Sequence, residues 1–185
     1  MPLHLRRALL LALLATTGPV AAACPVKLLD HTVLRLQDEK PQSLCQYAGK
    51  VVLVVNTASF CGFTPQYRAL EALHQRLAGR GFVVLGFPSN DFGAQEPGTN
   101  RQIAEFCEST FGVRFPMFAK TRVAAGAGQH PLFAELSRRG GGPPQWNFHK
   151  YLIDRRGETV IGHPSRVSPD DPAFVRDLGK LLDAR

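Results

Sequence analysis

The distribution of apolar and polar residues along the chain predicts a strand–helix–strand unit at its centre. Two predominantly apolar runs, residues 51–56 and 82–87, have the length and side chains of strands covered on both faces. Between them, apolar residues repeat at helical spacing over residues 65–77. Because such a connection crosses over right-handed, the two strands are expected to lie parallel in one sheet.

Other segments complete the expected fold. Residues 31–36 and 42–44 predict an N-terminal β-hairpin. The later elements are an extended piece at 115–118, a helix that begins with residues 131–136, a hairpin of 149–154 with 158–161, and a helix at 170–182. This order is typical of an α/β thioredoxin-like fold, a central mixed sheet flanked by helices, with an N-terminal β-hairpin extension.

A helix after the second strand has a clear start signal. Thr99 and Gln102 are spaced as in a capping box, in which each side chain bonds the other residue's backbone N–H. Ile103, Phe106 and Thr110 follow at helical spacing and are expected on its inner face.

The first 23 residues have the pattern of a secretory signal peptide. Arg6 and Arg7 precede the apolar stretch 8–14, and residues 21–23 form a small-residue cleavage site. The apolar stretch is too short to span a bilayer. We therefore expect export, most simply to a bacterial periplasm.

Cleavage after Ala23 would leave residues 24–185 as one domain of ordinary size. A lipid anchor on Cys24 as the first mature residue is the alternative. Against it, position 21 is alanine, where the bacterial lipoprotein signal usually has leucine.

Composition argues against two classes of ligand. The formal net charge is +7, or +5 after loss of the two signal-segment arginines, and the basic residues are scattered among acidic ones. No basic stripe for nucleic acid is formed. The six histidines show no ligand spacing, so neither a metal nor another cofactor is expected.

Four cysteines remain after export. In an oxidising compartment an even number invites pairing, and four allow three connectivities. Cys24 and Cys45 precede the first core strand, whereas Cys61 and Cys107 adjoin helical segments in the body of the domain. We favour a structural disulfide between the first two and a reactive pair in the others.

Cys61 has the surroundings of a reactive thiol. It follows a buried strand and precedes Thr64 and Pro65, which are typical of an N-cap and a first helical position. A cysteine in such a turn lies at the positive end of the helix dipole, which favours thiolate over thiol. A buried packing cysteine is the alternative. No C-x-x-C motif is present at Cys61, which argues against a general disulfide oxidoreductase.

Three segments resemble the signature blocks of the glutathione peroxidase family: VVLVVNTASFCGFTPQY, LGFPSNDFGAQEPGTNRQIAEFC and WNFHKYLIDRRG. They occur in the family's order, and the similarity covers nearly all of the mature chain. The resemblance implies a thioredoxin-type fold and a catalytic tetrad of Cys61, Gln95, Trp146 and Asn147, with Cys61 as the peroxidatic residue.

The chemistry of these side chains agrees with peroxide reduction. A thiolate attacks one peroxide oxygen while the other leaves as hydroxide, which must be stabilised and protonated. The amides of Gln95 and Asn147 and the indole N–H of Trp146 are donors that do not themselves titrate. The product at Cys61 is a sulfenic acid, which condenses with a thiol to give a disulfide.

By the same resemblance, Cys107 corresponds to the resolving cysteine of the thioredoxin-dependent branch. A disulfide needs Cα atoms within about 7 Å. Because Cys107 lies near the end of the helix started by Thr99, we expect this helix to unwind partly during turnover. A packing residue on the helix face is the alternative interpretation of Cys107.

Some features depart from parts of the family. Ser89 and Asp91 stand where many relatives have cysteine and glutamine. The insertion that carries subunit contacts in tetrameric relatives is not found around residues 124–130, which favours a monomer.

The expected function is a thiol peroxidase that reduces hydrogen peroxide and organic hydroperoxides and is re-reduced by a thioredoxin-like donor. Such an enzyme protects against oxidative stress. A glutathione-dependent peroxidase and a peroxide-sensing redox transducer are the alternatives.

Overall fold

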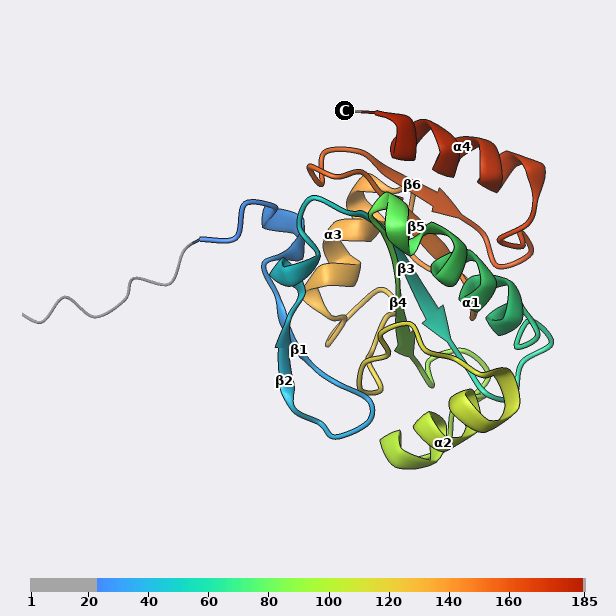
Figure 1. The fold of residues 1–185 in the computed structure, drawn as a ribbon. Helices are drawn as coiled ribbons and strands as arrows, with labels where there is room; N and C mark the ends of the chain where they lie inside the picture. The colour runs from blue at the N-terminus through green and yellow to red at the C-terminus, as the bar shows by residue number, and fades with distance from the viewer. Residues whose placement is uncertain (1–22, 185) are drawn as a thin grey trace, which may run out of the picture.

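Four strands form a central mixed sheet in the order β4-β3-β5-β6 (Figure 1). In this computed structural model, β3 (Val51–Thr57) pairs in parallel with β4 (Phe82–Pro88) and antiparallel with β5 (Lys150–Ile153). β5 in turn pairs antiparallel with β6 (Val160–His163). The predicted parallel strand–helix–strand unit and mixed sheet are confirmed.

The structure describes residues 23–184. The predicted signal peptide therefore lies outside the described residues, apart from Ala23. Among the residues that are described, none of the helices has both the length and the apolar character needed to cross a membrane.

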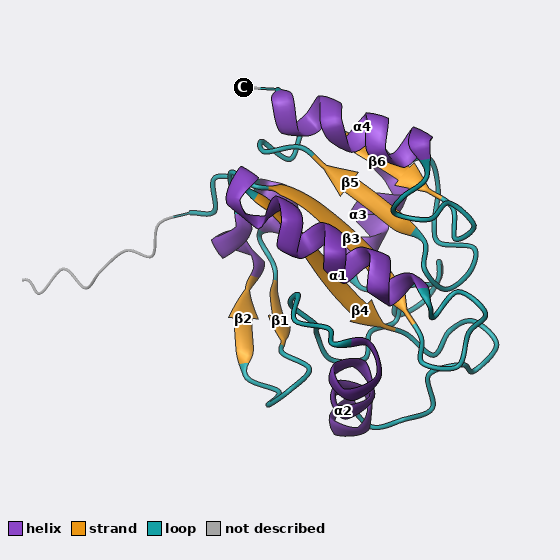
Figure 2. Ribbon diagram, turned by 45° about the vertical axis from the view of Figure 1, so that its right-hand side comes forward, coloured by secondary structure: helices purple, strands orange, loops and turns teal. Residues whose placement is uncertain are grey.

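Helices cover both faces of the sheet, as the apolar strands require (Figure 2). α1 (Gln66–Leu77) and α4 (Pro172–Asp183) pack on one face, and α3 (Pro131–Arg139) packs on the other. Along β3 the side chains alternate between the two cores: Leu53 joins the α1–α4 side and Val54 the α3 side. This is the thioredoxin-like arrangement predicted from the order of elements.

The N-terminal hairpin forms a separate two-stranded sheet, as predicted, but its first strand is shorter and its second strand begins and ends one residue earlier. β1 (Thr32–Leu34) pairs antiparallel with β2 (Pro41–Ser43). Leu44, expected to end the second strand, instead begins the short helix η2 (Leu44–Tyr47), because Ser43 caps it by accepting a hydrogen bond from the Cys45 N–H.

A disulfide between Cys24 and Cys45 ties the start of the described segment to this hairpin region, with the two Cα atoms 5.6 Å apart. It closes a loop that contains the short helix η1 (Lys27–Leu29). Leu28 and Leu29 of this helix pack into the core on the α3 side, so the extension is part of the domain's packing.

α2 (Asn100–Phe111) lies beyond the carboxyl ends of β3 and β4 (Figure 1). The predicted capping box is confirmed: Thr99 accepts from the Gln102 N–H at 3.3 Å, and Gln102 accepts from the Thr99 N–H at 2.9 Å. The helix ends at Gly112, which adopts a left-handed conformation with φ of 66°.

The inner face of α2 differs in part from the prediction. Ile103 and Cys107 are buried, but Thr110 is exposed and its assignment to the inner face was wrong. Phe111 takes that place because its ring packs against Tyr67 of α1, with centroids 5.4 Å apart. Helix α2 therefore docks through few fully buried side chains.

Two other boundaries differ from the expected ones. β6 begins two residues later than predicted, because the turn before it extends to Glu158, whose N–H donates to the Asp154 carboxylate at 2.7 Å. The extended piece at 115–118 contributes only isolated bridges, with Met117 beside Gly86 of β4.

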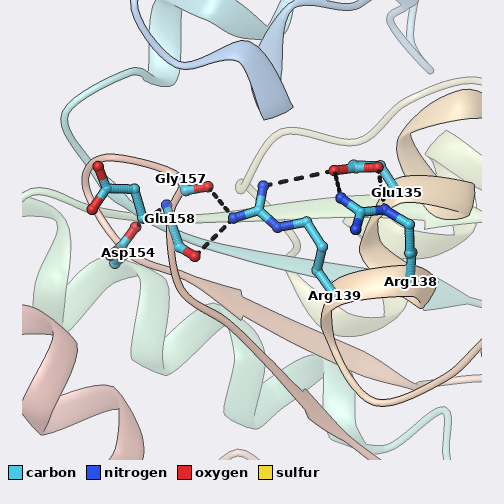
Figure 3. A network of polar contacts seen from close by, with 6 residues as sticks. All are labelled: Glu135, Arg138, Arg139, Asp154, Gly157 and Glu158. Carbon is cyan, nitrogen blue, oxygen red and sulfur yellow. Dashed lines mark hydrogen bonds and ion pairs between the residues drawn. The ribbon is translucent and has the colours of Figure 1, made fainter.

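A polar network ties α3 to the turn between β5 and β6 (Figure 3). The Arg139 guanidinium donates to the carbonyl oxygens of Gly157 and Glu158, both at 2.7 Å. Glu135 accepts from Arg138 at 2.6 Å and lies 3.8 Å from Arg139. This network fixes the end of α3, and hence the start of the segment that leads to Trp146.

Candidate active site

Cys61 lies in the turn between β3 and α1, as the sequence predicted, but the turn is built differently. Helix α1 begins at Gln66, and Thr64 is not its N-cap. The Thr64 hydroxyl accepts from the Cys61 N–H at 3.0 Å and donates to the Ala58 carbonyl at 2.9 Å. The first N–H groups of the helix are already bonded within the turn, so the threonine does not cap them. Its hydroxyl holds the backbone of Cys61 in place.

The Cys61 side chain is almost closed to solvent, at 9% exposure. The Phe63 N–H donates to its sulfur at 3.4 Å. A backbone donor at this place can stabilise negative charge that develops on the sulfur during a reaction. The neighbouring Phe60 is 66% exposed, so the cysteine lies just beneath the surface.

Gln95 and Asn147 are brought together from loops far apart in the sequence. The Asn147 amide donates to the Gln95 side-chain oxygen at 3.0 Å and to the Phe92 carbonyl at 3.3 Å. Asn147 is fully buried and Gln95 is half-buried. The amide hydrogen bond orients the Gln95 side chain, so that its own N–H groups are directed away from Asn147.

Trp146 lies beside the same pair. A Cβ atom on Gly93 would be 3.2 Å from the indole ring and 3.5 Å from the Gln95 side chain. Gly93 therefore allows Trp146 and Gln95 to approach each other across its backbone. The indole is 39% exposed, so it borders the site on the solvent side.

The Cys61 turn is joined to this group through the backbone. The Phe60 N–H, one residue before Cys61, donates to the Gln95 carbonyl at 3.1 Å. The structure thus connects all four residues predicted for the site: Gln95 contacts Asn147, Trp146 lies against the loop of Gln95, and that loop bonds the turn that holds Cys61.

Backbone strain accompanies the amide pair. Ala94, immediately before Gln95, has φ of 51°, and Phe148, immediately after Asn147, has φ of 64°. Left-handed conformations are costly for residues with side chains, and they cluster at functional sites where the surroundings enforce them. Here they adjoin the two residues whose amide side chains are hydrogen-bonded to each other.

Asn56 is a further residue of this site, one that was not predicted from the sequence. Its side chain donates to the Trp146 carbonyl at 3.1 Å and accepts from the His149 N–H at 3.1 Å. Its carbonyl accepts from the Phe148 N–H at 2.6 Å. Asn56 thereby fixes the segment of Trp146 and Asn147 against β3. The available signal was an asparagine that ends an aliphatic run expected to be covered on both faces.

Cys107 is buried in α2 and is separate from the amide group. Within residues 23–184, which hold all four cysteines, only Cys61 and Cys107 are free. Burial raises the pKa of the Cys107 thiol to about 11, partly offset by the Tyr67 hydroxyl beside it. The Cys107 carbonyl accepts from the Val113 N–H at 3.1 Å, so the cysteine is held within the closing turn of the helix.

Two cavities border these residues. One of about 380 Å³ lies between α2 and the Cys61 turn and is mainly apolar, with Phe60, Pro97, Ile103 and Phe106 in its wall. The other, of about 580 Å³, includes Trp146. Among the described residues, no group of three or more His, Cys, Asp or Glu side chains is arranged to hold a metal ion.

The departures at positions 89 and 91 have structural roles. The Asp91 carboxylate accepts from the N–H groups of Val123 and Ala124, at 2.6 and 2.8 Å. The Ser89 hydroxyl accepts from the Asp91 N–H at 3.3 Å. Both residues shape the loop that leads to Gln95.

Comparison with known proteins identifies the family. The glutathione peroxidase family model matches residues 28–137, which is more than half of the chain. The chain belongs to the glutathione peroxidase family. Membership of this family and the activities named for its relatives make the protein a peroxidase.

Individual members of the family are similar over most of their length. The hydroperoxy fatty acid reductase of Synechocystis sp. is 47% identical over 155 residues, covering 78% of this chain and 90% of that protein. A glutathione peroxidase-like peroxiredoxin of Schizosaccharomyces pombe is 46% identical over 138 residues, covering 72% and 87%. The crystal structure of T. cruzi GPX1 superimposes with a TM-score of 0.65 at 32% identity, covering 84% and 95%.

Proposed function

We propose that this peroxidase reduces hydroperoxides at Cys61 and completes its cycle through a disulfide with Cys107. The observation that carries the proposal is the convergence of Gln95, Trp146 and Asn147 on the loop that bonds the Cys61 turn. These side chains offer uncharged donors next to the turn that holds a nearly buried thiol. That is the environment which peroxide cleavage requires, because charge develops first on sulfur and then on the departing oxygen.

The first half of the cycle oxidises Cys61. Its thiolate attacks the terminal oxygen of ROOH, the O–O bond breaks, and the leaving alkoxide takes up a proton to give ROH. Cys61 then carries a sulfenic acid. The amide N–H groups of Gln95 and the indole N–H of Trp146 stabilise the leaving oxygen in this proposal.

The second half forms and reduces a disulfide. The Cys107 sulfur attacks the Cys61 sulfenic acid, the S–O bond breaks, and the Cys107 proton leaves with the hydroxyl as water. A dithiol protein of the thioredoxin type then reduces the Cys61–Cys107 disulfide. A relative named as a glutathione peroxidase-like peroxiredoxin supports a thiol-protein donor.

Fatty-acid hydroperoxides are the favoured organic substrates. The cavity beside the Cys61 turn presents Phe60, Pro97 and Phe106, which suit an acyl chain better than a polar substrate. The name of the Synechocystis relative, hydroperoxy fatty acid reductase, supports this substrate class. Hydrogen peroxide has no acyl chain to bind in an apolar cavity, and it is also a substrate in this proposal.

We further propose that the enzyme works as an exported monomer in an oxidising compartment. The signal-like residues 1–23 and the Cys24–Cys45 disulfide support export, since such disulfides persist outside the reducing cytosol. The disulfide also argues against a lipid anchor, because the Cys24 sulfur cannot carry a thioether and a disulfide together.

Steady-state peroxide consumption by the mature protein tests the proposal. With thioredoxin as sole reductant the wild type should turn over, Cys61→Ser should be inactive, and Cys107→Ser should stop after one equivalent. Activity of Cys107→Ser at the wild-type rate with thioredoxin would overturn the disulfide cycle. Efficient turnover of that variant with glutathione alone would instead identify a glutathione-dependent enzyme, and slow turnover with every reductant a redox transducer.

A further inference from the structure

A group of buried polar side chains lies between α2 and the body of the domain. Its members come from the end of β3 and the loop after it, from α1, from the loop before α2, and from α2 itself: Thr57, Ser59, Tyr67, Glu96 and Cys107. The three hydroxyls and both carboxyl oxygens of Glu96 are closed to solvent, and no described residue meets them with good hydrogen-bond geometry. Ser59 is still close enough to influence the pKa of Glu96, as Thr57 and Cys107 are for Tyr67. Buried polar atoms without partners are rare in folded proteins and call for an explanation.

Glu96 is the least expected member, because a fully buried carboxyl group is normally paired. Its backbone is held firmly: its N–H donates to Asn90 at 2.8 Å, and its carbonyl accepts from the Lys120 ammonium at 3.2 Å. The side chain on this backbone is fully buried, with both carboxyl oxygens closed to solvent. Burial raises the pKa of Glu96, and the nearby Ser59 and Lys120 offset this only in part.

Cys107 and Tyr67 share this environment. Burial raises the pKa of Tyr67 well above its ordinary value, and burial together with the charge of Glu96 raises the pKa of Cys107 to about 11. While α2 is docked, the interior accommodates all three groups best in their neutral forms. An ionised Glu96 would be a buried negative charge facing the thiol of Cys107, and Ser59 and Lys120 would compensate it only in part.

We propose that Glu96 is a positioning residue for the resolving step: its protonated carboxyl allows α2 to stay docked, and its ionisation releases the helix so that Cys107 can reach Cys61. This inference rests on the proposed disulfide cycle. The released helix exposes Glu96 to water, where the carboxylate is stable, and Cys107 becomes free to attack the Cys61 sulfenic acid. The attack itself releases water, as described above.

The direction of the pH effect follows from the raised pKa. The docked state binds the Glu96 proton more tightly than the open state, so docking is most favourable below the ordinary pKa of a glutamic acid. It weakens as the pH rises through the raised pKa of the docked form. Each unit by which the pKa of Glu96 in the docked state exceeds its pKa in the open state changes the opening equilibrium tenfold.

The other groups around Glu96 act elsewhere on the pH scale. Tyr67 of α1 and Cys107 of α2 ionise only in the alkaline range, given their raised pKa values. Lys120 is exposed and bonds the carbonyl oxygens of Glu96 and Gly98 rather than the carboxylate. A change in helix opening between pH 4.5 and 7.5 therefore reports on Glu96.

Amide hydrogen exchange of the reduced protein tests the inference without requiring turnover. Each exchange rate is first corrected for the intrinsic pH dependence of amide exchange. In the wild type, opening of α2 should increase with pH, while the amides of β3 keep constant protection. Glu96→Gln, which holds a neutral side chain of the same shape, should show slow opening at every pH. Glu105→Gln, which removes an exposed carboxylate from the same helix, is the matched control and should behave as the wild type.

Rapid-quench mass spectrometry then measures how fast the Cys61–Cys107 disulfide forms after one equivalent of peroxide. Glu96→Gln should slow this step and remove its pH dependence, while Cys61 oxidation keeps its rate. Opening that is independent of pH in the wild type overturns the inference, whether or not the variant folds. If the disulfide never forms but opening still follows Glu96, the proposed cycle fails and the role of Glu96 in docking stands.

Discussion

The side-chain amide of Asn147 donates to the side-chain oxygen of Gln95 at 3.0 Å, across 52 residues of sequence. A fully buried Asn147 thus determines which way the half-buried Gln95 presents its amide. Because Gln95 can donate toward a substrate only with its N–H groups free, the bond to its oxygen is the productive arrangement for stabilising a leaving oxygen. The pair acts as one unit, in which the buried residue orients the accessible one.

Replacing Asn147 by alanine should lower kcat/KM for peroxide by about 10²–10³, the loss typical of removing one oxyanion-stabilising donor. The thiol of Cys61 remains, so titration with a thiol reagent should still find it. Gln145→Ala is the matched control: its amide lies one residue from Trp146, is exposed and bonds only the Pro143 carbonyl among described groups. Equal kcat/KM values for the two variants would remove Asn147 from the mechanism.

Asn56→Ala tests whether the strand end holds the site together. The substitution leaves the Trp146 carbonyl and the His149 N–H without their partner, which should lower the free energy of unfolding by about 2–4 kcal/mol. Trp146 is the only tryptophan, so its fluorescence in urea follows both unfolding and local loosening of the site.

The control for Asn56 is Asn100→Ala, which removes two surface hydrogen bonds, to Glu39 and from the Lys120 N–H. It should cost less than 1 kcal/mol, as is usual for surface substitutions without a special role. An Asn56→Ala protein as stable as this control, with unchanged emission from Trp146, would contradict the role assigned to Asn56.

The parts of the fold that the sequence predicted well are those with strong periodicity. The apolar runs predicted β3 and β4, and the spacing of apolar residues predicted α1. Strands that are apolar on both faces must be covered by helices, which indicates the layers of the fold. The hairpin strands, three residues each, were placed only approximately, since side-chain caps such as Ser43 decide where such short elements end.

The site was less accessible to sequence reasoning. The turn position of Cys61 followed from the strand and helix around it. The meeting of Gln95 with Asn147 did not, because loops carry no periodicity that encodes their contacts, and it was expected only from the family resemblance. Glu96 likewise gave no signal: a glutamate in a loop of Gly, Gln and Pro is ordinarily exposed.

The Cys24–Cys45 disulfide should stabilise the domain without affecting catalysis. It closes a loop of 21 residues, for which the chain-entropy estimate is about 3 kcal/mol. The double variant Cys24→Ser, Cys45→Ser should unfold at correspondingly lower urea and keep the wild-type rate of Cys61 oxidation. A reductant should shift the urea midpoint of the wild type and leave that of the double variant unchanged; equal shifts in both would exclude a structural disulfide.

Lys150 should make stability depend on pH. It is fully buried, its ammonium donates to the Phe148 carbonyl at 2.7 Å, and burial lowers its pKa to about 7. The unfolded chain, with a lysine pKa of about 10.4, binds more protons between these values, so the free energy of unfolding should rise with pH from about 7 to 10. The gain is several kcal/mol, since each pKa unit corresponds to about 1.4 kcal/mol.

Above pH 7 the difference between the wild type and Lys150→Met isolates this effect. The charge of Lys150 helps to lower the pKa values of His149 and His163, so both histidines are already neutral in that range. Urea unfolding at pH 6, 7, 8 and 9 should show the wild type gaining stability relative to the variant above pH 7. Lys120→Met, which also removes an ammonium bonded to backbone carbonyls but at an exposed position, should give a curve parallel to the wild type. If the Lys150→Met curve also runs parallel to that of the wild type, the buried lysine keeps its ordinary pKa. Its charge then does not make the stability of the fold depend on pH.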